Sequence, residues 1–182
     1  MNEIEKNTVA WYVMRVTYQR EMAAAEILNA EAVENYVPTV KVKRRNSEGV
    51  AIGWKIDPLV HNYIFIHSTF NRIMELKTGK LDYLRFLMAT DSSTNQKVPQ
   101  YVPDKEMESF MKIVKTEGMK TLDTSIDLRK GDRVRVLTGQ FEGVEGIFMR
   151  MPTRHESRVV VKIEGVATVA TVALKASDVE KI

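Results

Sequence analysis

The spacing of hydrophobic and polar residues predicts a strand followed by a helix at the start of this 182-residue chain. Val9–Val16 is rich in β-branched and aromatic residues on both of its faces, which predicts a central strand. Residues 17–31 are rich in strong helix formers, with Thr17 as a candidate N-cap, and predict the first helix.

The middle of the chain predicts a hairpin and a second strand and helix. Strand-like runs at 34–45 and 50–56 flank the turn residues Asn46–Gly49, so we expect a projecting β-hairpin. Leu59–Ser68 predicts an apolar strand, and residues 69–79 predict a short helix that ends near its glycine.

Two more elements complete the first half. Residues 84–88 predict another strand, and a polar loop follows at 89–96. Residues 102–115 predict the clearest amphipathic helix of the chain, because apolar residues recur at helical spacing after Pro103.

Past residue 126 the pattern changes to short strands separated by glycine turns, which is typical of a small closed β-barrel. The sequence therefore predicts an α+β fold in two domains. Residues 1–115 form an α/β sandwich with an antiparallel sheet, 116–126 form a linker, and 127–182 form the barrel. Abundant β-branched residues after 157 disfavour helix and favour strand. We therefore expect a stable barrel that does not refold into helices and is independent of the first domain.

Charge is nearly balanced along the whole chain. There are 27 basic and 24 acidic residues, divided as 17 against 16 up to residue 125 and 10 against 8 beyond it. Neither half has the excess of a protein that coats nucleic acid, so any such contact should come from a local patch. The densest patch is Lys41–Arg45, for which a solvated strand end is an equally good interpretation.

Reactive groups are sparse, and we expect no catalytic residues, metal site or cofactor. The chain has no cysteine and three histidines, and His61 and His67 would lie about 20 Å apart on one strand. No hydrolase, metalloprotease or phosphate-loop motif is present. No apolar run is long enough for a membrane span and no signal peptide is visible, so we expect a cytoplasmic protein without membrane contact.

Phe141 stands out between Gly139 and Gly143, where the alternation of the strands is interrupted. One interpretation is that its ring caps the open end of the barrel. The other is that it is an exposed anchor for a protein partner. The sequence leaves these two interpretations open.

Several motifs carry a family resemblance. "GDRVRVLTGQFEGVEGIF" resembles a KOW motif, and "WYVMRV", "YVPTVKV" and "PLVHNYIFI" resemble the NusG N-terminal domain in the right order. The resemblance covers nearly the whole chain. It implies a NusG-like N-terminal domain and a C-terminal SH3-like barrel.

The resemblance also implies a function and its residues. It implies a monomeric elongation or antitermination factor that binds the clamp helices of RNA polymerase. An apolar patch of Leu59, Val60 and Tyr63 would contact the polymerase. Upstream or non-template DNA would lie near Tyr12, Arg15 and Arg20. The patch of Lys41, Lys43, Arg44 and Arg45 is a candidate nucleic-acid contact from its charge alone, and an acidic protein surface would fit it as well. Rho or a ribosomal protein would bind the barrel through Gln140, Phe141 and Glu142.

Two departures favour a specialised member. This chain has His61-Asn62-Tyr63 where housekeeping members read Pro-Gly-Tyr, and Gln140 where they often have proline. It therefore resembles RfaH and the UpxY group, which implies action on particular operons such as capsular-polysaccharide loci. The alternative is a KOW-type structural RNA-binding protein of the ribosome, which should be strongly basic.

Overall fold

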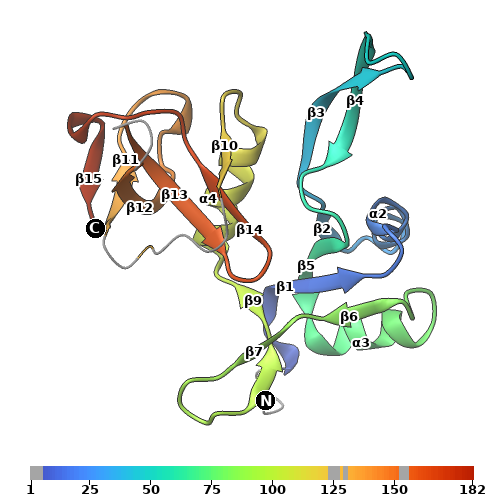
Figure 1. Ribbon diagram of the computed structural model, residues 1–182. Helices are drawn as coiled ribbons and strands as arrows, with labels where there is room; N and C mark the ends of the chain where they lie inside the picture. The colour runs from blue at the N-terminus through green and yellow to red at the C-terminus, as the bar shows by residue number, and fades with distance from the viewer. Residues whose placement is uncertain (1–5, 123–127, 129–130, 152–155) are drawn as a thin grey trace. The chain divides into compact units, whose positions relative to one another are not determined.

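The computed structural model describes residues 6–122, 128, 131–151 and 156–182 (Figure 1). These residues divide into two compact units. The first contains the described residues up to Pro38 together with Lys43–Asp104, and the second contains Thr39–Val42 and the described residues from Lys105 onward. Each unit is described separately below.

The first unit is built on an antiparallel sheet with β1 at its centre. β1 (Val9–Val16) pairs with β5 (Tyr63–Thr69) along its whole length and with β6 (Leu84–Phe86) near its end. β2 (Glu34–Tyr36) pairs with the far side of β5, and β9 (Tyr101–Val102) pairs with the first half of β1. The prediction of a central first strand is confirmed.

Two helices pack on one face of this sheet and enclose its core. α2 (Glu21–Ala30) contributes Ala24 and Leu28, and α3 (Phe70–Thr78) contributes Ile73 and other apolar residues. Alternate residues of β1 and β5 face them, and Trp11, Val13 and Phe65 on the opposite face are buried as well. Thr69 caps α3 by accepting a hydrogen bond from the Arg72 N–H at 3.1 Å, which confirms the predicted second helix.

The first helix begins later than the sequence predicted, because the chain takes left-handed conformations before it. Tyr18 and Gln19 have φ of 60° and 52°, which ends β1 and delays α2 to Glu21. Thr17 is therefore not the N-cap. Its carbonyl and hydroxyl oxygens accept hydrogen bonds from the Arg20 guanidinium at 3.3 and 3.2 Å instead.

Two hairpins lie outside this sheet. β3 (Thr39–Arg45) and β4 (Ala51–Pro58) form the predicted hairpin. β7 (Met88–Thr90) and β8 (Lys97–Pro99) form a second one, where the sequence predicted only a polar loop. The Asp91 carboxylate accepts the N–H groups of the next turn residues, which explains how so polar a segment closes a hairpin.

The second unit contains helix α4 (Asp104–Lys115) and a six-stranded, barrel-like antiparallel sheet. The strands follow the order β10-β14-β13-β12-β11-β15. Their bounds are β10 Lys120–Leu122, β11 Asp132–Val136, β12 Glu145–Arg150, β13 Ser157–Ile163, β14 Ala167–Ala170 and β15 Val179–Lys181. The predicted strands after residue 157 are confirmed, and so is the mixed α/β fold class.

The compact units do not follow the predicted domain boundaries at every residue. Helix α4 groups with the barrel-like sheet, although the sequence assigned it to the first domain. Lys120–Leu122 is strand β10, within the segment 116–126 that was predicted to be linker. Residues 123–127 lie outside the described residues, and the domain boundaries themselves stay a prediction.

Gly146 gives a test of the packing in the second unit. A Cβ at this position would lie 2.6 Å from the Val160 carbonyl oxygen and 2.8 Å from a Val159 methyl group. We expect Gly146→Ala to lower the free energy of unfolding by about 1–3 kcal/mol, measured by urea denaturation followed by circular dichroism.

A matched control is Gly79→Ala, because a Cβ there meets no heavy atom within 4 Å. It should leave the unfolding transition of the second unit unchanged. Equal denaturation curves for the two variants would contradict the close approach of β12 and β13.

Candidate functional surfaces

The predicted polymerase-binding residues lie together where β4 leads into β5. Leu59 and Val60 form a bend, Tyr63 begins β5, and all three side chains are half-buried. The Leu59 N–H donates to the Pro38 carbonyl oxygen at 2.7 Å, which ties the bend to the chain before β3. The bend therefore presents partly exposed apolar side chains on a fixed backbone.

Asn62 holds this bend in place. Its φ is 67°, in the left-handed region that glycine and asparagine adopt most readily. Its backbone carbonyl accepts the Val16 N–H at 2.8 Å, and its side-chain carbonyl accepts the Gln19 N–H at 3.0 Å. Asn62 thus adopts a conformation that a glycine could also adopt, and it adds a side-chain hydrogen bond that glycine lacks.

A buried acid lies beside the same bend. Glu21 is 1% exposed, and one of its carboxylate oxygens is 3.4 Å from His61 Nδ1. Its other oxygen has no hydrogen-bond partner among the residues that the structure describes. Glu21 is the first residue of α2, where the helix dipole stabilises a carboxylate. This contact could not be predicted from local patterns, because 40 residues separate Glu21 and His61 along the chain.

Arg20, in the loop between β1 and α2, lies over two aromatic rings. The Arg20 guanidinium carbon lies 3.8 Å from the centre of the Tyr83 ring and 5.8 Å from that of Tyr18. Tyr18 is 87% exposed and, like Gln19, is held in a left-handed conformation, which is a strain that often marks functional sites. Sequence reasoning selected Arg15 and Arg20, which are exposed, but missed both tyrosines.

Tyr12 does not belong to this surface, contrary to the sequence-based expectation. It is only 2% exposed, and its ring packs edge-on against Phe70 and Phe86. On β1 it faces the helices, whereas Arg15 faces solvent. A ring enclosed in the core offers no contact to nucleic acid.

The basic patch lies on β3, close to the turn of the first hairpin. Its members Lys41, Lys43, Arg44 and Arg45 are all exposed. The Arg45 guanidinium donates to the Gly49 carbonyl oxygen at 2.6 Å and so helps to close the turn. The exposure of the patch fits both interpretations that the sequence left open, a nucleic-acid contact and a solvated strand end.

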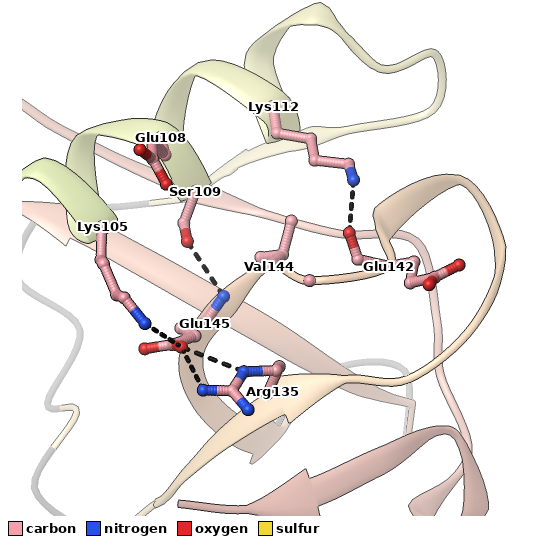
Figure 2. A pocket seen from close by; sticks show the side chains of 9 residues that line it. Lys105, Glu108, Ser109, Lys112, Arg135, Glu142, Val144 and Glu145 are labelled. Atoms are coloured by element: carbon pink, nitrogen blue, oxygen red, sulfur yellow. Dashed lines mark hydrogen bonds and ion pairs between the residues drawn. The ribbon is translucent and has the colours of Figure 1, made fainter.

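Phe141 is buried in the second unit, with 1% of its surface exposed. Its neighbours Gln140 and Glu142 are exposed, but both are bound by groups from α4 or the turn after it. The Gln140 side chain donates to the Glu117 carbonyl oxygen. The Lys112 ammonium donates to the Glu142 carbonyl oxygen, as Figure 2 shows. The burial favours the cap interpretation over an exposed anchor.

A cavity of about 280 Å³ lies between α4 and the strands β11 and β12, lined by charges of both signs. At its centre the Glu145 carboxylate accepts hydrogen bonds from Arg135 at 2.8 and 3.1 Å, with Lys105 at 3.7 Å (Figure 2). The Arg135 hydrogen bond, helped by neighbouring cations, lowers the pKa of Glu145 against the opposing effect of burial. The Glu145 N–H donates to Ser109 Oγ at 2.9 Å. These charges neutralise one another, so the cavity has a structural role.

Within the described ranges, no group of three or more His, Cys, Asp or Glu side chains could hold a metal ion. No helix in the same ranges is long and apolar enough to cross a membrane.

Comparison with known proteins gives two findings. The family model described as "Transcription termination factor nusG" matches residues 9–111. The solved structure described as "Domain interaction in Thermotoga maritima NusG" is 25% identical, covers 96% of this chain and 98% of that chain, and has a TM-score of 0.42. Among curated proteins, none matches this chain.

Asn62 provides a test of the bend. We expect Asn62→Ala to destabilise the protein by about 1–2 kcal/mol, because alanine is strained in the left-handed region. Asn62→Gly is the control, because it keeps the conformation and loses only the hydrogen bond to Gln19. In thermal unfolding, Asn62→Gly should have a higher melting temperature than Asn62→Ala. A lower melting temperature for Asn62→Gly would contradict a left-handed conformation of Asn62.

Phe141 provides a test of the second unit. Replacement by alanine should cost about 3–5 kcal/mol, because it leaves a cavity where a buried ring was packed. Guanidinium denaturation of the full chain measures this loss. Gln140→Ala, at the exposed neighbouring position, should stay within about 0.5 kcal/mol of the unchanged protein. An unchanged free energy of unfolding for Phe141→Ala would show that the ring is exposed in solution.

Proposed function

The chain belongs to the NusG family of transcription factors, whose model matches residues 9–111, and from this premise we propose that it binds RNA polymerase and promotes elongation or antitermination. NusG-family factors bind RNA polymerase. The polymerase contact that we propose is the bend of Leu59, Val60 and Tyr63. The observation that carries this choice is that these apolar side chains stay partly exposed on a backbone fixed by Asn62.

A factor of this kind needs no reactive group. If it binds one conformation of the polymerase more tightly than another, binding shifts the population toward that conformation. The size of the shift cannot exceed the difference in the two binding free energies. A pre-formed apolar bend suits this role, because little conformational entropy is lost when the complex forms.

We place a nucleic-acid contact next to the polymerase contact. Arg15 is paired directly with Tyr63 across β1 and β5, so an exposed cation lies beside the apolar bend. The stacked pair of Arg20 and Tyr83 and the exposed Tyr18 extend this surface along the loop. Arginine and aromatic rings together suit the phosphates and bases of upstream or non-template DNA.

A narrower proposal is that the factor acts on particular operons, such as capsular-polysaccharide loci, like RfaH or the UpxY group. Its support is His61 and Gln140, the positions that depart from housekeeping members. Asn62 adds little support, because its left-handed conformation is one that the glycine of Pro-Gly-Tyr also adopts readily. Rho or a ribosomal protein would reach the barrel-like sheet through Gln140 and Glu142, since Phe141 is buried.

Val60→Asp tests the proposed polymerase contact. A carboxylate in an apolar interface loses its hydration without gaining a partner, so we expect retention on purified RNA polymerase to fall at least about tenfold. Pull-down with immobilised polymerase measures the retention, and circular dichroism checks that the variant is folded.

The matched control is Val9→Asp, which adds the same charge at an exposed valine. Val9 pairs with Thr69, at the opposite end of the β1 and β5 pairing from Tyr63. This variant should bind polymerase as the unchanged protein does. Equal retention of Val60→Asp and Val9→Asp would remove the bend as the contact.

A further inference from the structure

The outer part of the β3–β4 hairpin has no buried face. Every residue of Ala51–Ile56 is exposed, and Ile52, Trp54 and Ile56 are 54%, 65% and 66% exposed. A ribbon of two strands buries too little surface to be stabilised by its own packing. Large apolar side chains that stay in water on such a ribbon mark a surface that binds a partner.

Cations lie directly beside these apolar side chains. The Lys43 ammonium is 5.7 Å from the centre of the Trp54 ring, and Lys43, Arg44 and Arg45 follow one another on the exposed strand. Residues 43–57 contain four basic and two acidic side chains. One of the acids, Asp57, is paired with Lys55 at 3.0 Å. The partner should therefore offer apolar surface and negative charge close together.

We propose that this hairpin binds single-stranded DNA, with a base stacked on Trp54 and the adjoining phosphate bound by Lys43. A nucleotide carries a flat apolar face and an anion in one unit, which matches the neighbouring ring and ammonium. This site is separate from the surface around Arg20 and does not depend on polymerase binding.

Duplex DNA and RNA fit the same side chains less well. In a duplex the faces of the bases are stacked on one another, so nothing there would cover Trp54. RNA would gain nothing from its 2′-hydroxyl here, because Ile52 and Ile56, the neighbours of Trp54 along β4, offer it no hydrogen bond. Single-stranded DNA presents uncovered bases and a sugar without that hydroxyl.

The test measures binding of a fluorescein-labelled oligothymidylate of about twelve nucleotides to the full chain by fluorescence anisotropy. Trp54→Ala should weaken binding at least about fivefold, and Trp54→Phe should stay within about threefold, because phenylalanine still stacks. Lys43→Gln should weaken binding and make it less dependent on salt. Tyr101→Ala removes another exposed aromatic ring and should leave binding unchanged.

Tryptophan fluorescence of the unchanged chain is an independent measurement. Trp11 is 4% exposed, so quenching on addition of the unlabelled oligonucleotide should come from Trp54 and should disappear in Trp54→Phe. Trp54 is exposed, so its variants should melt as the unchanged protein does, which thermal unfolding checks.

The proposal would be overturned if Trp54→Ala bound the oligonucleotide as tightly as the unchanged chain does. It would also be overturned if oligouridylate or duplex DNA bound as tightly as oligothymidylate. Full binding by Trp54→Leu would overturn it too, because it would indicate a surface for an apolar protein. No polymerase is present in these measurements. A negative result in the oligonucleotide measurements would therefore not affect the proposed polymerase contact. A negative result in the Val60→Asp pull-down would likewise not affect the proposed DNA contact of the hairpin.

Discussion

The turn at Asn62 is the constraint on which the candidate polymerase contact depends. Its left-handed backbone reverses the chain between β4 and β5, and its two carbonyl groups bind the N–H groups of Val16 and Gln19. One residue therefore joins the end of β1, the loop before α2 and the apolar bend. A change in the conformation of the loop that carries Arg20 should shift the backbone at Leu59 and Val60, because Asn62 is bonded to that loop and belongs to the same turn as the bend.

Patterns along the sequence predicted most elements whose residues are set by local preference. The strand at Val9–Val16, helix α3 behind the cap of Thr69 and the β-branched strands after 157 are of this kind. The late start of α2 was not predictable, because Tyr18 and Gln19 have no intrinsic preference for positive φ. The burial of Glu21 beside His61 depends on contacts between distant segments, which periodicity does not report.

The two aromatic residues Phe141 and Trp54 show why exposure was hard to predict. Phe141 follows a glycine turn and has polar neighbours, so the sequence left its exposure open, and the structure buries its ring. Trp54 lies in a strand-like run of the predicted projecting hairpin, with isoleucines two residues away on each side, and the sequence did not indicate whether these side chains would be covered. A strand pattern indicates which apolar side chains favour burial, but it does not indicate whether they are buried by the same chain or by a partner.

This chain has a net charge of only +3, yet it can offer cationic contacts, because its charges are paired differently in different places. In the second unit, Glu145 pairs with Arg135 at 2.8 Å and lies 3.7 Å from both Arg133 and Lys105, so an acid lies beside each of these cations. In the first unit, Arg20 lies over an aromatic ring and Lys43 lies beside another, and neither contact cancels a positive charge. Positive charge is thus locally separated from negative charge beside these rings, although residues 1–125 as a whole carry only one more basic than acidic side chain. A net charge averaged over the chain hides this separation, which is why local pairing is the better guide to where such a protein binds.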